Sequence, residues 1–416
     1  MALVVQKYGG TSVADVERIR SVARRVIARK NVGDSLVVVL SARAGDTDRL
    51  LALAREMSVN PDPRELDVLL STGEQVTVAL FTMAVKDLGF EAESMTGYQA
   101  GIITDHHYGE ARINWIETQF IKDKIQEGKI VVVAGFQGYD DEGNITTLGR
   151  GGSDTTAVAL AAALEADLCE ICTDVEGVFT TDPGIYNKAR KLKKVSYEEM
   201  LEMASMGAKV LHLRSVEFGM KYNVPILVCS SFIDAPGTLV TKEDEEMEKV
   251  VVSGITYNRN EARITLTNVP DVPGMAAQLF RPISEAGINV DLIVQGSGSV
   301  PGRANLSFTV PKAHYEQTMR IAEGVAKGMD AGVHSNPNIA KISVIGVGMR
   351  THSGVASKMF ETLARENINL KMISTSEIKI SCVIDEKYTE LAVRVLHDAF
   401  ELEKEPGDRI KIHEER

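Results

Sequence analysis

ALVVQKYGGTSV, residues 2–13, places an apolar run directly before two glycines, a threonine and a serine. A strand that ends in a glycine turn and leads into a helix is typical of α/β proteins. The glycines let the backbone approach a ligand, and the helix start presents free N–H groups to an anion. Lys7 precedes the glycines, whereas a Walker loop places its lysine after them. The stretch predicts a phosphate site of another kind; the alternative is a tight turn with a serine N-cap and a surface lysine.

The same alternation continues over roughly the first 240 residues. Apolar residues recur at helical spacing over 13–27, 64–88 and 157–166. Further strands are expected at SLVVVLS (35–41), KIVVVAGF (129–136), DLCEICTD (167–174) and VPILVCS (224–230). This pattern predicts an α/β domain with a largely parallel sheet, in which ligands bind just after the strands.

Length and composition restrict the class of protein. The chain has 416 residues, enough for two or three domains, and 44% hydrophobic and 25% charged residues are ordinary for a soluble globular protein. A net charge of −12 argues against a nucleic-acid partner, which requires a basic surface. No apolar stretch approaches the ~20 residues that span a bilayer, and no secretory signal is visible, so we expect no membrane partner.

The four cysteines are too few for a disulfide framework and indicate a reducing compartment, so we expect a cytoplasmic protein. Cys169 and Cys172 form a CxxC pair, for which a redox or metal site must be considered. The pair lies in an expected buried strand, where an odd separation directs the two side chains to opposite faces. No second CxxC or histidine pair completes a zinc shell. We therefore expect structural cysteines and no metal site.

The chain changes character after KEDEEMEK, residues 242–249, a charged run typical of a linker. Beyond it, residues 269–294 align without a gap on 349–374, with Gly274 on Gly354 and Asn289 on Asn369. Each copy predicts a strand, a glycine-led helix, an Ile-Asn turn and a strand, and a further strand and helix follow. Two copies predict a tandem of small βαββαβ modules. We place the first domain at 1–240, a linker at 241–256, and the modules at 257–336 and 337–416.

LGRGGSDTTA, residues 148–157, repeats the pattern of the first motif at a second strand-to-helix junction. Arg150 offers a bidentate fork for a carboxylate, and Asp154 a carboxylate near the phosphate region. The alternative is that Ser153 is a plain N-cap and Arg150 a solvated arginine. Two such turns in one domain favour a ligand site.

Three weaker motifs complete the set. In LLSTGEQV (69–76), Glu74 interrupts an apolar helix face, which suits binding of a substrate amine, although Ser71 and Glu74 also match a capping box. In CTDVEGVFTTDPG (172–184), Thr173 and Asp174 end a strand before a loop that suits a nucleotide or any strand-to-helix connection. In MGAKVLH (206–212), Lys209 is a possible second phosphate lysine.

In sequence and in order, seven motifs resemble those of the aspartate kinases: KYGGTSV, SARAGDTDRL, STGE, GRGGSDTTA, TDVEGVFTTDP, MGAKVLHLRS and STSEIKIS. The resemblance covers essentially the whole chain. It implies an amino acid kinase domain, a three-layer αβα sandwich with a mostly parallel sheet, followed by two ferredoxin-like ACT domains that sense small molecules.

The resemblance also implies a reaction. The γ-phosphoryl group of MgATP would pass to the side-chain carboxylate of L-aspartate, giving 4-phospho-L-aspartate, the first step towards lysine, threonine and methionine. Since this carboxylate is already ionised at pH 7, the reaction needs positioning and charge stabilisation and no general base. Mg²⁺ would arrive with the phosphates, because it keeps waters and few protein ligands.

Individual roles follow from the same resemblance. The catalytic residues would be Lys7 and Lys209, which neutralise phosphate charge, and Asp154, which orients them. Arg150 would bind the substrate α-carboxylate and Glu74 its amine. The remaining aspartate-pocket residues would be Ser41, Thr47, Gly151, Gly152 and Ser153. The nucleotide would contact Lys7, Tyr8, Gly9, Gly10, Thr173, Asp174, Phe179, Lys209 and Val210.

In the ACT modules the resemblance implies effector binding by Asp271, Asn289, Asp291, Gln295, Ser376 and Glu377, for which turn and cap roles are the alternative. Threonine, lysine or both would be the inhibitors, and the modules commonly pair between chains, so a homo-oligomer is expected. Three residues depart from the family pattern. Arg43 replaces a small or apolar residue, and Leu213 and Ser353 stand where proline is frequent. Arg43 bears on substrate affinity.

Alternatives stay open. A kinase of the same fold could act on glutamate or acetylglutamate, although Glu74 with Arg150 favours a free amino acid. A catalytically silent amino-acid sensor would lack Lys7, Arg150 or Asp154, and all three are present. A dinucleotide-binding dehydrogenase would require GxGxxG after the first strand, where this chain has KYGGTS.

Overall fold

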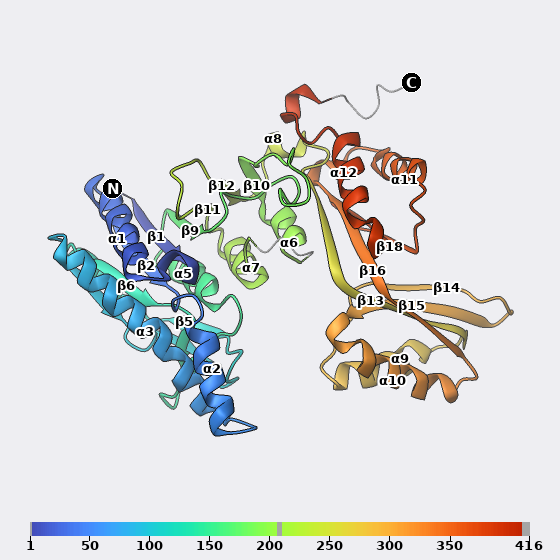
Figure 1. Cartoon of the computed structure of the whole chain (residues 1–416), viewed down its shortest axis with the longest axis horizontal. Coiled ribbons are helices and arrows are strands. Elements are labelled where there is room, and N and C mark those ends of the chain that lie inside the picture. The colour runs from blue at the N-terminus through green and yellow to red at the C-terminus, as the bar shows by residue number, and fades with distance from the viewer. Residues whose placement is uncertain (1, 206–209, 410–416) are drawn as a thin grey trace. The chain divides into compact units, whose positions relative to one another are not determined.

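The computed structural model describes residues 2–205 and 210–409. The chain divides into two compact units (Figure 1). Unit 1 comprises Met1–Phe179 and Lys191–Glu248, and unit 2 comprises Thr180–Arg190 and Lys249–Arg416.

Unit 1 is built on an eight-stranded sheet. All neighbouring strands are parallel except β11 and β12, which confirms the expected, largely parallel sheet. The strands predicted from the apolar runs form its centre. In spatial order they are β10 (Lys194–Ser196), β12 (Thr238–Thr241), β11 (Ile226–Ser230), β9 (Leu168–Thr173), β1 (Leu3–Tyr8), β2 (Ser35–Leu40), β6 (Ile130–Ala134) and β3 (Ala92–Met95).

Helices cover both faces of this sheet, because its central strands are apolar on both sides. On one face, α1 (Val16–Asn31) and α3 (Pro63–Asp87) pack on β1, β2 and β6 in one apolar core. On the other face, the alanine-rich α5 (Gly152–Ala163) packs on β1, β2 and β9. The remaining helices of this unit are α2 (Asp46–Met57), α4 (Gln119–Gln126), α6 (Tyr197–Ser205), α7 (Leu213–Tyr222) and α8 (Glu245–Glu248).

A second, four-stranded sheet extends unit 1 beside α3. Its spatial order is β5 (Ile113–Ile116), β4 (Ile102–Thr104), β7 (Gln137–Tyr139) and β8 (Ile145–Thr147). Asp67 of α3 anchors it, because this buried carboxylate accepts hydrogen bonds from the Gly109 amide (3.0 Å) and from the Thr147 amide and hydroxyl (both 2.7 Å). The small sheet therefore has a fixed position on α3.

Unit 2 contains one six-stranded sheet shared by two modules. The first half carries α9 (Met275–Glu285) and α10 (Tyr315–Lys327), and the second half carries α11 (Val355–Arg365) and α12 (Thr389–Ala399). The repeat offset of 80 residues relates α9 to α11. In spatial order the strands are β14 (Ile293–Ser297), β15 (Arg303–Pro311), β13 (Gly254–Pro270), β16 (Gly332–Ile345), β18 (Lys379–Asp385) and β17 (Met372–Thr375).

The two long strands, β13 and β16, run through both modules. Ile264 and Leu266 of β13 lie in the core with α9 and α10, whereas Ile255 lies in the core with α11 and α12. Residues 254–258 pair with 341–345 and thus give the second module a strand that precedes the first module in sequence. The linker expected at 241–256 therefore ends earlier, and the second module is discontinuous.

The aligned glycines explain the repeat in physical terms. Gly274 and Gly354 are the N-caps of α9 and α11, with φ of 94° and 96°. This left-handed conformation is strained for other residues, so each copy requires glycine before its helix. Ser353, where proline is frequent, lies in the turn before this cap.

Thr180–Arg190, predicted to lie inside the first domain, instead belongs to unit 2. The Thr180 hydroxyl lies 2.9 Å from Nε2 of the buried His397, and the Tyr186 hydroxyl donates to Asp398 at 2.5 Å. Tyr257 on β13 donates to Asp182 at 2.8 Å. Side chains of α12 and β13 thus hold a segment that directly follows the TDVEGVF loop.

The cysteines are buried free thiols, as expected. Cys172 packs in the core with α1 and α3, and its sulfur lies 3.5 Å from that of Cys229 on the neighbouring strand. Burial raises the pKa of the Cys169 thiol, which keeps it protonated.

One helix in the described part of the chain, α3, is long and apolar enough to cross a membrane. Half of that stretch is buried in unit 1, and α3 carries the buried carboxylates Asp67 and Glu74. Core helices of globular proteins pass the same test, so this is weak evidence for a membrane span.

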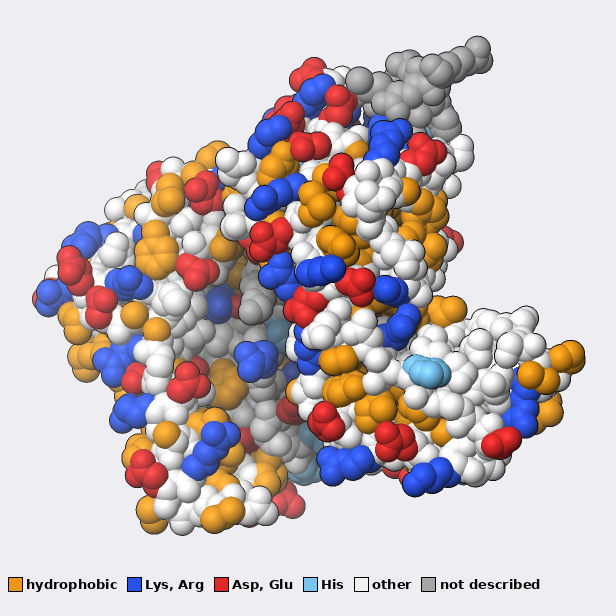
Figure 2. Space-filling model, turned by 45° about the vertical axis from the view of Figure 1, so that its right-hand side comes forward, with side chains coloured by type: hydrophobic (Ala, Val, Ile, Leu, Met, Phe, Trp, Pro, Cys, Tyr) orange, Lys and Arg blue, Asp and Glu red, His pale blue; other side chains and the backbone are white. Residues whose placement is uncertain are grey.

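Basic and acidic side chains are interspersed over the face shown in Figure 2.

Candidate active site

A cavity of about 390 Å³ opens at the carboxyl ends of β1, β2 and β6 and at the first turn of α5. Parallel strands bring distant motifs to one edge of the sheet, and this edge is where an α/β fold binds its ligand. The cavity is lined by Lys7, Gly10, Ser41, Ala42, Arg43, Ala44, Gly45, Thr47, Asp48, Glu74, Phe136, Gly149, Arg150, Gly151, Gly152, Ser153 and Asp154.

Lys7 of the KYGGTSV motif and Asp154 of the GRGGSDTTA motif form an ion pair in the cavity. The Lys7 ammonium lies 2.6 Å from Asp154 Oδ1, and the two side chains are only 12% and 14% exposed. Lys7 is on the central strand β1 and Asp154 in the first turn of α5, so both have rigid supports. The pair holds a cation where a helix N-terminus also favours negative charge.

The first glycine turn is packed tightly against the end of β2. A Cβ on Gly10 would lie 2.7 Å from the Ala42 carbonyl oxygen, which only glycine avoids. Gly10 also accepts a hydrogen bond from the Ala44 amide at 3.1 Å. Ser12 lies in a short 3₁₀ turn and Asp15 caps α1, so Ser12 is not the N-cap of that helix.

Glu74 is a buried carboxylate in the middle of α3. One oxygen, Oε1, accepts the Ala42 amide at 2.9 Å, while Oε2 is buried without a hydrogen-bond partner in the described residues. Burial raises the pKa of Glu74 to about 7. The helix begins at Pro63 with Asp62 as its N-cap, and Ser71 donates to the Val68 carbonyl, which excludes the capping box.

The second glycine turn places Arg150 at the mouth of the cavity. Gly151 is the N-cap of α5 with φ 72°, so Ser153 is not the cap. A Cβ on Gly151 would lie 2.2 Å from His212 Cγ, so the turn packs directly on this imidazole. Burial lowers the pKa of His212 and keeps the ring neutral, and its Nδ1 is buried without a partner in the described part of the chain.

The residues expected to contact the nucleotide lie in different environments. Thr173 and Asp174 follow β9, where the Thr173 carbonyl accepts the Ser231 amide at 2.8 Å and the Ser12 hydroxyl reaches Ser231 at 2.7 Å. Phe179 is half-buried and pairs with Lys191. The Tyr8 side chain is fully buried in the core, so only its backbone is available to a ligand. Lys209 lies outside the described residues, and Val210, the first described residue after that gap, is a half-buried turn residue.

Comparison with known proteins narrows the alternatives. Residues 2–230 match the amino acid kinase family, and residues 266–324 and 342–400 match the ACT domain. The chain is 55% identical over 410 residues to aspartate kinase Ask_LysC of Stutzerimonas stutzeri (strain A1501), which covers 98% of this chain and 99% of that protein. The chain belongs to the aspartate kinases of the amino acid kinase family.

Solved structures agree with this assignment. E. coli aspartokinase III in complex with aspartate and ADP (R-state) is 27% identical, with a TM-score of 0.78 over 95% of this chain and 99% of that one. The same protein in complex with lysine and aspartate (T-state) is 26% identical, with a TM-score of 0.76 over the same shares. The expected kinase fold with tandem ACT domains is thereby confirmed, and this aspartate kinase is a phosphotransferase.

The first ACT module of the aspartate kinase has a cavity of about 380 Å³. It is lined by Val269, Pro270, Asp271, Val272, Pro273, Gly274, Met275, Ala276, Gln295, Ala304 and Leu306. Asp271 and Gln295 meet there, because Gln295 Nε2 donates to Asp271 Oδ1 at 3.3 Å.

The other expected effector residues are not brought to this cavity. Asp291 is paired with Lys341, a 4%-exposed lysine that also lies 2.8 Å from Glu261. Asn289 is exposed and does not line the cavity. In the second module, Ser376 and Glu377 lie in the exposed turn between β17 and β18, and Glu377 lies 3.5 Å from Arg350. Of the four residues predicted for the first module, Asp271 and Gln295 line this cavity, and effector binding by all four stays a prediction.

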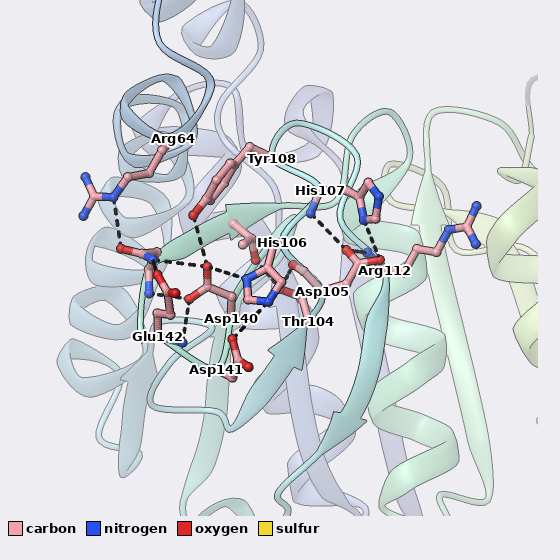
Figure 3. A network of polar contacts seen from close by, with 12 residues as sticks. Arg64, Thr104, Asp105, His106, His107, Tyr108, Arg112, Asp140, Asp141 and Glu142 are labelled. Atoms are coloured by element: carbon pink, nitrogen blue, oxygen red, sulfur yellow. Dashed lines mark hydrogen bonds and ion pairs between the residues drawn. The ribbon is translucent and has the colours of Figure 1, made fainter. Parts of the chain in front are cut away.

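A polar network in the segments that follow β4 and β7 brings together three side chains of metal-ligating types, His106, Asp140 and Asp141 (Figure 3). The buried Asp140 accepts hydrogen bonds from the amides of Glu142 and Asn144, from the Tyr108 hydroxyl and from the Asn144 side chain. His106 lies between Asp140 and Asp141 at 3.3 and 3.2 Å. A metal ion here would displace the hydrogen bonds that close the turn, so we interpret the network as structural.

Several site residues were missed by sequence reasoning. The Ala42 amide binds Glu74, Phe136 lines the cavity with φ 70°, and His212 supports Gly151. Phe136 follows the KIVVVAG strand, a signal that could have been used. The family departures are accommodated: Arg43 is held by both oxygens of Asp46, at 2.8 and 3.4 Å, and Leu213 is the first residue of α7, where proline is also tolerated.

Proposed function

We propose that this aspartate kinase transfers the γ-phosphoryl group of MgATP to the side-chain carboxylate of L-aspartate, giving 4-phospho-L-aspartate. This would be the first step towards lysine, threonine and methionine. The observation that carries the proposal is the convergence of the Lys7–Asp154 pair, Glu74 and Arg150 on one cavity. These groups match, one for one, a phosphoryl group, an ammonium and an α-carboxylate.

The substrate would bind with its amine on Glu74, whose buried Oε2 has no hydrogen-bond partner among the described residues, and its α-carboxylate on the Arg150 fork. An ammonium next to Glu74 would lower the pKa of that carboxyl again and favour its ionised form. Ser41 and Thr47 line the cavity between the two glycine turns and would contact the reacting side chain. A free amino acid fits this charge pattern better than an acetylated one.

The phosphoryl group would meet Lys7 at the first glycine turn. Its charge would be stabilised by this ammonium, by Lys209 and by backbone N–H groups of Gly9 and Gly10. Asp154 would hold the Lys7 ammonium in place. It would not act as a general base, since the substrate carboxylate is itself the nucleophile. Thr173, Asp174, Phe179 and Val210 would line the nucleotide side.

Mg²⁺ would supply charge neutralisation on the ATP phosphates. Asp154 already holds Lys7, and Asp174 is exposed with its Oδ1 accepting the Thr173 hydroxyl at 3.0 Å. This donor set suits a cation that enters with the phosphates and keeps most of its waters.

We further propose inhibition by lysine, threonine or both through the ACT modules, with Asp271 and Gln295 as the polar contacts of the first module. Every residue of the edge strand β14 is exposed, including Ile293 and Val294, and such an edge is suited to pairing with a second copy. The proposed enzyme is thus a cytoplasmic homo-oligomer.

The test is a hydroxamate assay of the full chain with MgATP and hydroxylamine, comparing L-aspartate, L-glutamate and N-acetyl-L-aspartate. We expect product with L-aspartate and at least a tenfold lower kcat/KM with the others. Equal rates with the acetylated acid would contradict the role of Glu74. Adding lysine and threonine separately then identifies the inhibitor, and a rate insensitive to both would contradict the regulatory proposal.

A further inference from the structure

A smaller cavity, of about 90 Å³, lies within unit 2. It is formed by the segment that leads into β13, by α11 and by the chain that follows α12. None of its residues belongs to the sites described above. The lining residues are Lys249, Val250, Val251, Val252, Lys358, Ala399, Phe400, Glu401, Pro406 and Arg409.

Arg409 presents an unsatisfied guanidinium nitrogen in this region. Nη1 donates to the Val252 carbonyl at 2.6 Å and Nε to the Lys404 carbonyl at 3.3 Å, which fixes the plane of the group. Nη2 is buried and has no hydrogen-bond partner in the described residues. A buried N–H without an acceptor is costly, and on a charged group more so.

Charged groups of both signs lie near Arg409. Burial lowers the pKa of its guanidinium to about 10, and Arg190 acts in the same direction, whereas Glu405 and Glu401 oppose it. The group is still charged at neutral pH. Lys249 and Lys358 line the same cavity. The carboxylate of Glu401, the acid among the lining residues, already accepts Lys404 at 2.6 Å.

The cavity is lined by three cationic side chains and by one carboxylate that is paired with a lysine. This combination of charges favours binding of an anion. The volume of the cavity corresponds to about three water-sized groups, which admits a carboxylate or phosphate group and little more. We propose that this cavity binds a small oxyanion, a carboxylate or phosphate group, with Arg409 Nη2 as its hydrogen-bond donor and Lys249 and Lys358 as supporting charges. Val252 and Phe400 supply apolar walls for the carbon of a carboxylate.

Binding is tested by thermal unfolding and titration calorimetry of the full chain with inorganic phosphate and with acetate, at constant ionic strength against chloride. The two anions distinguish a phosphate source from a carboxylate source. We expect a saturable rise in Tm with at least one of them, and at least tenfold weaker binding in Arg409→Gln. Arg320→Gln, an exposed arginine of α10, is the matched control and should bind like the parent.

Phosphate could also bind at the kinase cavity, so the titrations are repeated in Lys7→Ala. A response lost in Lys7→Ala but kept in Arg409→Gln would overturn the proposal, as would no response beyond chloride in the parent. Arg409→Lys keeps the charge but loses the fork, and we expect intermediate affinity. It replaces Arg409→Gln if circular dichroism shows that the latter does not fold.

Discussion

The kinase cavity and the cavity of the first ACT module have similar volumes, about 390 and 380 Å³, but are built differently. The kinase cavity is formed by loops from several strands and holds the buried carboxylate of Glu74 and the largely shielded Lys7–Asp154 pair. The ACT cavity is formed by the end of β13, the loop that follows it, the start of α9 and the strands β14 and β15, and its polar residues Asp271 and Gln295 are exposed.

This difference shows what each site requires. Phosphoryl transfer depends on charges held rigidly out of water, where electrostatic stabilisation is strongest. A sensor needs only differential affinity between two states, and an open site at a sheet edge can be completed by another chain. The following experiments test this contrast, beginning with the largest effect.

Lys7→Ala removes the buried cation of the kinase cavity. We expect kcat to fall about 10³-fold or more, the loss typical of one preorganised charge at a transferring group. Lys122→Ala, on the outer helix α4, is the matched control and should leave kcat unchanged. A fall of less than tenfold in Lys7→Ala, with an unchanged circular dichroism spectrum, would remove Lys7 from the reaction.

Glu74 should give substrate binding a pH dependence. Its pKa is raised to about 7 by burial, so below that pH the free carboxyl is protonated and must lose its proton to bind an ammonium. We expect KM for L-aspartate to rise up to about tenfold per pH unit below 7 and to level off above it. In Glu74→Gln, KM should be about 10²-fold higher and lose this dependence. If KM changed with pH in the same way in the parent and in Glu74→Gln, the assignment of Glu74 to the substrate amine would be contradicted.

The pH dependence of stability tests whether the buried His397 of unit 2 has only a structural role or is coupled to effector binding. Burial lowers the pKa of its imidazole to about 4, so the ring is neutral beside Thr180. The unfolded chain binds a proton at about pH 6.5, and stability should therefore be complete above that value and fall as pH drops towards 4. We expect a loss of about 2 kcal/mol over this range by denaturant unfolding.

The matched variant is His397→Gln, which cannot take up a proton and should show a flatter profile. The inhibition constants of lysine and threonine should not change with pH in the way that stability does in either protein, since His397 does not line the ACT cavity. An inhibition constant that shifts with the same apparent pKa would instead connect Thr180–Arg190 to effector binding.

The sequence predicted the kinase domain better than the regulatory one, for a physical reason. Apolar runs followed by polar turns identify parallel strands, and the parallel neighbours β1 and β2 must bring Lys7 and Ser41 to one edge. The capping alternatives for Ser12, Ser71 and Ser153 could not be rejected without knowing where the helices begin. His212 and Ala42 stand in the quoted motifs MGAKVLH and SARAGDTDRL, but their roles depend on packing and on a backbone amide, which the residue types do not reveal.

In unit 2, the repeat identified two modules but not their exchange of strands. Residues 254–256 were predicted as linker and 257–258 as part of the first module, yet all five pair with β16 in the second module. Thr180–Arg190 lies among kinase motifs and joins unit 2 through long-range contacts. Asp291, predicted to bind an effector, is paired with Lys341, a partner 50 residues away in sequence. Long-range partners of this kind are not encoded in local spacing.

The smallest effect is expected at the ACT cavity. Asp271→Asn keeps the size of the side chain and its contact with Gln295 but removes the charge that an effector ammonium would meet. Because Asp271 is exposed, its ionic contact is worth about 1 kcal/mol or less, so the inhibitor concentration for half-maximal effect should rise about fivefold. Asn289→Ala, outside the cavity, should leave that concentration unchanged. A loss of 10²-fold or more in Asp271→Asn would mean that Asp271 is buried when the effector binds, as it would be if a second chain closed the open edge at β14.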